Sequence, residues 1–486
     1  MDERLLTDAD LELLPGRGER SPWLREALAA EGDPQPAAPL TGVTDADVAI
    51  IGGGYTGLWT AHQLLDQEPD LRVVLLEADI CGGGPSGRNG GFVNSWWDEA
   101  SGLVSSFGVA GARACLEEVA RSVHEIGAWC ERHGVDAHYR RSGMLVVSTT
   151  PAHDERLDDD IAAAAELGEP DAFRTLDANE IADRCRSPRF RGGALMRDGA
   201  TVHPAHLVRG LRRLALERGV VVHERTRVTA VRDGPGGMLR IRSSDGEVSA
   251  RRAVLAVNAW ASGWPGARFR ILAWGSYMVR SEPIPELVAT ELGWTGGESI
   301  VDARFSVHYL HVTRDGRIAI GAGGGRPGFD GRIGPSFTDD VDAARRAAFA
   351  FRWLFPQLRE VRLTDAWGGP IDVSPDHLPH VWSTHGGRMH VAAGYSGNGV
   401  APSHLVGRLL AALVLESDEP ITRLPIVGRP GPPFPPEPFR YVGARVIREA
   451  MIRREDAEEA GRRPNRLLRE LSRIPRRIGY HLGPGA

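Results

Sequence analysis

The sequence predicts a mixed α/β (α+β) fold in which the chain passes several times between a domain with a parallel sheet and a domain with an antiparallel sheet. Three observations predict it. Residues 47–91 have the pattern of a strand, a glycine turn, a helix and a second strand. Residues 390–415 repeat a strand, a glycine turn and a helix, and residues 269–365 contain several short alternating strands.

The first pattern is a dinucleotide cradle, built on the turn GGGYTG at 52–57. Gly52 allows the tight turn, Gly54 lets backbone N–H groups approach a pyrophosphate at the helix N-terminus, and Gly57 lets the helix pack closely on the strand. The second strand ends in Glu77. A carboxylate at this place accepts hydrogen bonds from ribose hydroxyls.

A second glycine-rich loop follows, with the sequence GGGPSGRNGG at 82–91. Its free N–H groups can form an anion-binding nest beside the same pyrophosphate. Because NAD-binding domains rarely need such a loop, we predict FAD. The alternative is a βαβ turn that binds no ligand, which the complete strand–turn–helix–strand context disfavours.

These segments resemble the D-amino-acid-oxidase-like superfamily of flavoproteins, whose members carry the pattern DVxIIGGGxxGLxxAxxL…LLEA…GxSGRNGG and include sarcosine, glycine and gamma-glutamylputrescine oxidases. The resemblance extends along nearly the whole chain and implies a Rossmann-like FAD-binding domain of glutathione-reductase type. Together with the motifs it implies these cofactor-binding residues: Gly52, Gly54, Tyr55, Thr56, Gly57, Glu77, Ala78, Ser86, Gly87, Arg88, Asn89, Gly90, Gly91, Val228, Asn258, Ala259, Gly394, Gly397, Asn398, Gly399 and Val400.

The resemblance also sets the expected domain boundaries. The FAD-binding domain is discontinuous, and the substrate domain fills the gaps. We expect an N-terminal arm at 1–43, the FAD-binding domain at 44–95, 200–268 and 366–420, the substrate domain at 96–199 and 269–365, and a proline-rich linker with a helical tail at 421–486. Within them the patterns predict helices near 109–133, 153–167 and 205–218, a hairpin near 238–249, and strands at 143–147, 220–223, 227–231, 253–257, 271–280, 305–312 and 317–321. The glycines at 321–325 read as a loop, because no helix pattern follows them.

The motif HVAAGYSGNGV at 390–400 predicts another anion site at a helix start. The resemblance implies that this helix points at flavin N1 and C2=O, where negative charge accumulates on reduction. The segment WGGPID at 367–372 resembles the one beneath the isoalloxazine ring. The following residues depart from the usual DGLPxxG, with Trp382 at the last glycine.

For the substrate pocket, strand alternation places Phe305, Val307, Tyr309 and His311 on one face. Tyr309 and His311 can orient substrate and Arg304 can add positive charge, with ordinary core or surface roles as the alternative. Aromatic-wall candidates are Trp96, Trp97, Tyr277 and Tyr395, so the catalytic candidates are Tyr309, His311, Tyr395, Arg304, Trp97 and Tyr277. The HxxH spacings at 203–206 and 308–311 lack a matching carboxylate, and we predict no metal site.

Composition narrows the function. The chain has 486 residues, 42% hydrophobic and 25% charged, with a net charge of -6 that argues against a nucleic-acid partner. We expect no signal peptide and no membrane span, hence a cytoplasmic enzyme. The four cysteines form no CxxC and are expected to be reduced. In the tail, acidic residues interrupt an arginine-rich helical pattern that could otherwise contact a membrane surface, which favours packing on the protein itself or on a second subunit of a homo-oligomer.

Lysine is absent from the sequence. An amine nucleophile or Schiff base is therefore excluded. Sarcosine-oxidase-like relatives use a lysine near flavin N5 to activate O2, and this chain has no such group. We therefore expect either O2 or another oxidant as the electron acceptor. No cysteine follows Cys185, which removes the sarcosine-oxidase type of covalent attachment and predicts non-covalent FAD.

The sequence therefore predicts an FAD-dependent oxidoreductase that oxidises the C–N bond of a small amine by hydride transfer to flavin N5, after which the imine hydrolyses. The segment SGRNGGFVxSWW, the loop 321–332 and the tail segment 435–445 look most like the aminophosphonate oxidoreductases, which implies an aminophosphonate substrate. The alternatives are an oxidase of a carboxylated or polyamine-derived amine, of sarcosine or gamma-glutamylputrescine type, and a glycerol-3-phosphate-type alcohol dehydrogenase. A non-enzymatic FAD-stabilised scaffold is a further alternative.

Overall fold

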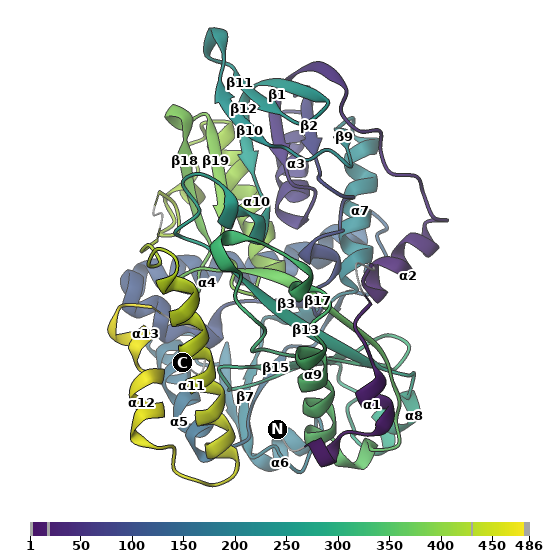
Figure 1. Cartoon of the computed structure of the whole chain (residues 1–486), viewed down its shortest axis with the longest axis vertical. Coiled ribbons are helices and arrows are strands. Elements are labelled where there is room, and N and C mark those ends of the chain that lie inside the picture. Colours follow the sequence, from purple (N-terminus) through teal and green to yellow (C-terminus); the bar gives the residue numbers. More distant parts are fainter. Residues whose placement is uncertain (1–2, 17–19, 429–430, 481–486) are drawn as a thin grey trace.

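Two eight-stranded sheets form the frame of the protein in the computed structural model, which describes residues 3–16, 20–428 and 431–480. In Figure 1 the first sheet lies in the upper part of the molecule and the second in the lower part, with the C-terminal helices in yellow beside the second. A three-stranded sheet, β3-β8-β4, brings together three short segments that are distant in the sequence.

The first sheet is centred on β1, which is apolar on both faces. Val48 and Ile50 enter one core and Ala49 and Ile51 another, as expected for a parallel strand covered on both sides. The strands follow the order β10-β11-β12-β1-β2-β9, with β19 also pairing with β12 and β18 with β19. Their bounds are β1 Gly42–Ile51, β2 Val73–Leu76, β9 Val221–His223, β10 Ala230–Asp233, β11 Leu239–Arg242, β12 Gly246–Leu255, β18 His380–Thr384 and β19 Met389–Ala393.

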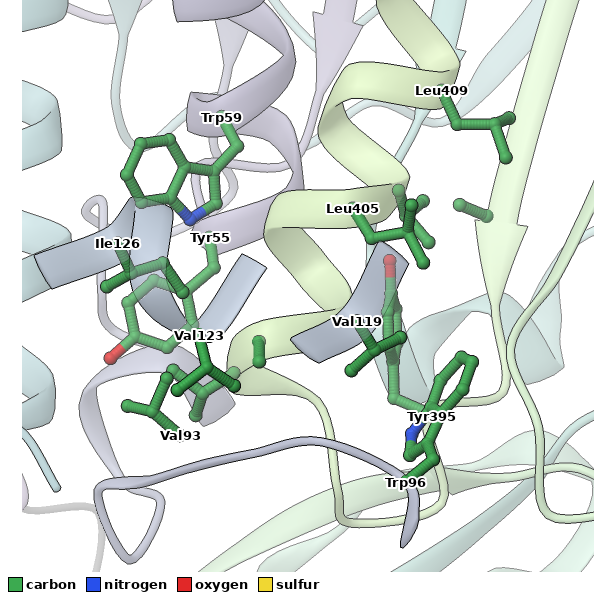
Figure 2. Close-up of a cluster of buried hydrophobic side chains, with 14 of the residues drawn as sticks. Tyr55, Trp59, Val93, Trp96, Val119, Val123, Ile126, Tyr395, Leu405 and Leu409 are labelled. Carbon is green, nitrogen blue, oxygen red and sulfur yellow. The ribbon is translucent and has the colours of Figure 1, made fainter. Parts of the chain in front are cut away.

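Helices cover one face of this sheet and bury its largest core. They are α3 (Tyr55–Gln67), α7 (Pro204–Glu217) and α10 (Val400–Val414), with α4 (Ala100–Arg132) beneath them. Figure 2 shows Tyr55 and Trp59 of α3 and Leu405 and Leu409 of α10 converging with the side chains of α4. This packing fixes the N-termini of α3 and α10 relative to one another.

The second sheet has the order β17-β13-β16-β15-β14-β5-β7-β6 and is antiparallel except for the parallel pair β14–β5. Helix α9 (Val341–Leu354) covers one face of it with alanine and phenylalanine side chains. Its strands are β17 Leu363–Val373, β13 Leu272–Ser281, β16 Ile318–Ala322, β15 His308–Val312, β14 Ser299–Asp302, β5 Met144–Ser148, β7 Gly192–Met196 and β6 Phe173–Leu176. The strands of the three-stranded sheet are β3 Phe92–Asn94, β4 Arg140–Arg141 and β8 Gly199–Thr201. The outer helices are α5 Pro151–Glu166, α6 Ala178–Ala182 and α8 Pro285–Thr290.

Three predicted boundaries differ from the structure. Residues from 366 were expected in the FAD-binding domain, but β17 pairs along its length with β13 of the second sheet. The strand expected at 305–312 starts at His308, since the N–H groups of Phe305 and Ser306 donate to the Glu455 carboxylate instead of to a strand. The strand expected at 227–231 starts at Ala230.

The chain ends pack on this frame. The arm carries α1 (Asp8–Glu12) and α2 (Pro22–Ala30), and α2 buries Trp23 and Leu24 against the second sheet. The tail carries α11 (Phe439–Glu459), α12 (Arg466–Ser472) and α13 (Ile474–Arg477) and packs on the protein's own surface. Residues 429–430, which fall in the segment expected to hold the proline-rich linker, lie outside the described residues. Among the described helices, none is long and apolar enough to cross a bilayer.

Candidate FAD-binding site

A cleft of about 380 Å³ opens at the carboxyl ends of β1, β2 and β12. This is the edge at which parallel α/β sheets bind ligands. Its walls come from the cradle turn, the end of β2, the loop at 82–89, the end of β12, β17 and the start of α10. The predicted residues that line it are Gly52, Gly54, Tyr55, Thr56, Glu77, Ala78, Ser86, Arg88, Asn89, Val228, Asn258, Tyr395, Gly397, Gly399 and Val400.

Close backbone contacts require glycine at the cradle positions. A Cβ on Gly57 would lie 2.0 Å from the carbonyl oxygen of Gly52, so α3 packs on the turn only because this residue has no side chain. Gly52 has a φ of 114°, and a Cβ there would lie 2.2 Å from the carbonyl oxygen of Ala256. Gly54 caps α3 without a side chain.

Glu77 closes the end of β2 against the cradle. Its carboxylate oxygens accept the backbone N–H groups of Gly53, at 2.7 Å, and of Asp79, at 2.8 Å. Burial raises the pKa of Glu77. Each carboxylate oxygen retains a second lone pair, so the group can also accept a ribose hydroxyl from the cleft.

The loop at 82–91 is held by its own side chains. The Asn89 amide donates to the carbonyls of Pro85 and Ser86, both at 3.1 Å, while its oxygen accepts the N–H of Gly91 at 2.8 Å. Arg88 reaches across the cleft to the carbonyl of Gly368 at 3.2 Å. The loop thereby connects the first sheet to β17 of the second.

Seven of the predicted cofactor residues are not among those that line the cleft: Gly57, Gly87, Gly90, Gly91, Ala259, Gly394 and Asn398. Close packing explains several of them. A Cβ on Gly87 would lie 2.2 Å from the carbonyl oxygen of Gly82, and one on Gly91 would lie 2.2 Å from that of Val202. These glycines shape the loops that form the wall.

The distal motif closes the other end of the cleft. Gly394 and Gly397 have φ values of 99° and 93°, which glycine adopts without strain, and they turn the chain into α10. The Tyr395 hydroxyl lies 2.8 Å from Oγ1 of Thr56, linking the N-termini of the two helices. Burial raises the pKa of Tyr395, so its hydroxyl stays protonated.

Asp372 is a cleft residue that the predicted site omits, although it belongs to the recognised segment 367–372. It is fully buried on β17. Its carboxylate accepts the Asn258 amide at 2.7 Å and the N–H of Gly394 at 2.6 Å, and burial raises its pKa to about 7. Trp260, Trp264, Ile333 and Thr338 also line the cleft and had no recognisable motif.

Replacing Asp372 with asparagine should change how stability depends on pH. Because the folded pKa of about 7 lies above the ordinary value of 3.8, the wild type loses stability as pH rises through this window. The asparagine side chain carries no charge and escapes this loss. From pH 4 to pH 8 the unfolding free energy of the variant should therefore rise relative to that of the wild type by roughly 2–4 kcal/mol. Urea unfolding of both proteins across that range measures the gain, and parallel stability curves would contradict the assignment.

Five of the six catalytic candidates lie outside the cleft, and only Tyr395 lines it. Tyr309 lies beside the loop at 82–91: a Cβ on Gly90 would lie 3.2 Å from its ring. The Tyr309 ring passes over Gly321, and its hydroxyl lies 2.7 Å from Oγ of Ser276. His311 follows on the same strand, 4% exposed, and burial lowers its pKa to about 4, so it is neutral at pH 7.

Three catalytic candidates are buried away from the cleft lining. Arg304 is buried and pairs with Glu455 and Glu459 of α11, so it ties the tail to the body of the protein. Tyr277 is fully buried, donates to the carbonyl of Ser336 at 2.7 Å and accepts the N–H of Asp340 at 2.9 Å. Trp97 is 2% exposed in the large core. Arg304 and Tyr277 contact residues that are distant in the sequence, and the sequence pattern does not show such contacts.

The family described as "FAD dependent oxidoreductase" (DAO) matches residues 47–413. The chain belongs to this family. It is an FAD-dependent oxidoreductase, and the residues of the cleft fit that cofactor: a glycine turn without side chains, a carboxylate at the end of β2 and two helix N-termini. The arm before residue 47 and the tail after residue 413 lie outside the match.

The chain is similar to gamma-glutamylputrescine oxidoreductase of Escherichia coli K12, with 29% identity over 82% of this chain and 91% of that protein. It is also similar to the probable oxidoreductase OrdL of Haemophilus influenzae, with 26% identity over 78% and 85%. Among solved structures, L-proline dehydrogenase from P. horikoshii superposes with a TM-score of 0.64 at 20% identity, covering 80% of this chain and 97% of that one. Glycine oxidase from Geobacillus kaustophilus gives 0.61 at 21%, covering 79% and 98%. These structures confirm the fold class.

Proposed function

We propose that FAD lies along the cleft with its adenosine at Glu77 and Val228, its pyrophosphate at the cradle turn and its flavin end beside Asp372 and Tyr395. The observation that carries this proposal is the position of Glu77 beside a turn whose glycines admit no side chain. All four cysteines are buried and none lines the cleft, which supports non-covalent binding. Release of FAD by simple denaturation tests that point.

We propose that the enzyme oxidises the C–N bond of a small amine. Relatives named gamma-glutamylputrescine oxidoreductase, glycine oxidase and sarcosine oxidase subunit beta support this class. The glycerol-3-phosphate alternative gains no support from them. When bound, FAD supplies the two-electron acceptor at N5 for hydride from the carbon beside the nitrogen. The protein orients the amine, excludes water and holds protons at fixed hydroxyls.

The sheet face that carries Tyr309 is the proposed substrate wall. Tyr309 lies beside the loop at 82–91, and its hydroxyl shares a hydrogen bond with Ser276. Helix α2 covers this face with Trp23, which lies 6.1 Å from His311 between ring centroids. Neutral His311 and the Tyr309 hydroxyl can each donate one hydrogen bond to an amine substrate or its anionic group.

Anaerobic bleaching of the flavin by a panel of substrates tests this function. The panel contains 2-aminoethylphosphonate and its N-methyl derivative, glycine, sarcosine, gamma-glutamylputrescine and glycerol 3-phosphate. We expect an amine to bleach the flavin, and the aminophosphonates are our finer proposal for its identity. Bleaching by glycerol 3-phosphate alone would contradict amine oxidation.

The Tyr309→Phe variant refines the test. Loss of one hydrogen bond to the substrate should slow bleaching about 3- to 10-fold without loss of FAD. Tyr277→Phe is the matched control, since that hydroxyl serves only the core, and its rate per bound FAD should equal that of the wild type. Equal rates for all three proteins would remove Tyr309 from the substrate wall.

The absence of lysine predicts slow reoxidation by O2. A fixed cation near the reacting oxygen would stabilise the negative charge that develops there. We therefore expect the reduced enzyme to react faster with a quinone than with O2 in stopped-flow mixing. Formation of hydrogen peroxide in air at the rate of turnover would overturn this expectation.

A further inference from the structure

The tail sorts its charges between an inner and an outer face. Its exposed residues include eight arginines but one acidic residue, Glu449. Seven of these arginines follow Val446 in the sequence, at short intervals from one another. The eight are Arg445, Arg453, Arg462, Arg463, Arg466, Arg473, Arg476 and Arg477. The outer face is therefore strongly basic, in a chain whose net charge is -6.

Three acidic residues of α11, Glu455, Glu458 and Glu459, turn inward. Glu455 is 2% exposed and accepts from Ser306 and the backbone of Phe305, while Glu459 pairs with Arg304. Glu458 pairs with Arg156 of α5. These acids, which interrupt the basic pattern in the sequence, are neutralised by the body of the protein and leave the arginines facing solvent.

Few of the outer arginines are compensated. Arg453 pairs with Glu449, and Arg473 and Arg477 share Glu470. Within residues 3–16, 20–428 and 431–480, the other five, Arg445, Arg462, Arg463, Arg466 and Arg476, have no carboxylate at ion-pair distance. Like charges left together and unpaired are a footprint for an anionic partner.

Exposed apolar side chains lie in the same segment as these arginines. Phe439, Val442 and Val446 are 72%, 54% and 45% exposed and lie on one face of α11, at i, i+3 and i+7. Leu467 is 66% exposed and Ile478 is 54% exposed. Figure 1 shows α11, α12 and α13 together at the edge of the molecule.

We propose that this outer face of the tail, residues 439–478, docks on an anionic phospholipid surface. Arginines neutralise lipid phosphates while the apolar side chains enter the headgroup boundary, which is the binding mode of an interfacial amphipathic helix. Phosphate contacts alone would suit a nucleic acid equally well, but the solvent-facing phenylalanine, valines, leucine and isoleucine in the same segment as the arginines favour a lipid surface. Docking of this kind needs no membrane-spanning helix.

Vesicle flotation with the flavin-loaded full-length enzyme tests the proposal. The protein should float with vesicles of phosphatidylcholine and phosphatidylglycerol at low salt, and should remain behind with pure phosphatidylcholine. The variant Arg462→Glu, Arg463→Glu, Arg466→Glu and Arg476→Glu should bind at least about 100-fold more weakly, since each arginine contributes to attraction by the surface. Its flavin content and thermal midpoint should equal those of the wild type.

The matched control replaces four exposed arginines elsewhere with glutamate and has the same net charge as the tail variant. These arginines are Arg174, Arg191, Arg213 and Arg251. It should bind within about threefold of the wild type. A second variant, Phe439→Ser with Val442→Ser, should weaken vesicle binding at unchanged charge. The proposal is overturned if the wild type ignores anionic vesicles at low salt, if both charge variants lose binding equally, or if duplex DNA competes while the serine variant binds vesicles normally.

Discussion

Replacing Gly57 with alanine should cost the protein its FAD and at least about 2–3 kcal/mol of unfolding free energy. The added Cβ would lie 2.0 Å from the carbonyl oxygen of Gly52 and 3.1 Å from the side-chain Cγ2 of Ile50, and the Gly52 backbone cannot yield without moving the cradle. Thermal unfolding and the flavin absorbance of the purified variant measure both losses.

Gly102→Ala is the matched control for this substitution. It adds the same methyl group to a glycine inside α4, where no atom lies within 4 Å of the new Cβ. We expect unchanged FAD content and a gain of about 0.5–1 kcal/mol from reduced backbone entropy. If both variants keep their flavin and unfold at the same temperature, the close approach of α3 to the turn is not what holds the site.

Replacing Glu224 with glutamine should destabilise the protein by about 3–5 kcal/mol. Glu224 is fully buried and accepts Arg212 at 2.7 and 2.9 Å. It also accepts the N–H groups of Cys81, at 2.8 Å, and of Ala37, at 2.6 Å. The neutral amide leaves the buried Arg212 without its counter-charge and loosens both the loop beyond Glu77 and the arm.

The control for Glu224 lies on the same helix as its partner. Arg213 pairs with Glu217 at 2.9 Å, but both side chains are about half exposed. Glu217→Gln should therefore change the free energy of unfolding by less than about 0.5 kcal/mol. Equal urea midpoints for the two variants would mean that the buried Arg212–Glu224 pair contributes no more to stability than the exposed pair.

The cradle could be predicted because its chemistry is local. Gly52, Gly57 and Glu77 lie within one strand–turn–helix–strand unit, and the close contacts that require the glycines form inside that unit. The first and second sheets were likewise indicated by short-range apolar patterns. The two sheets and the superposition on a solved structure confirm the predicted fold class.

The substrate side could not be predicted in the same way, because its contacts join distant parts of the chain. Arg304 looked like a free cation before its predicted strand, and its partners are more than 150 residues away on α11. Asp372 gains its environment from Asn258 and Gly394, which lie on two other elements. The cover supplied by Trp23 comes from an arm whose sequence carries no motif.

A crystal structure of the purified yellow enzyme tests the central claim most directly, since it shows what the cleft holds and in which direction. The account predicts FAD with its ribose hydroxyl hydrogen-bonded to Glu77, its pyrophosphate over the turn at 52–57 and its flavin ring between Tyr395 and β17. The contrary result is a cleft that binds no dinucleotide, or FAD lying in the reverse direction with the flavin ring at Glu77.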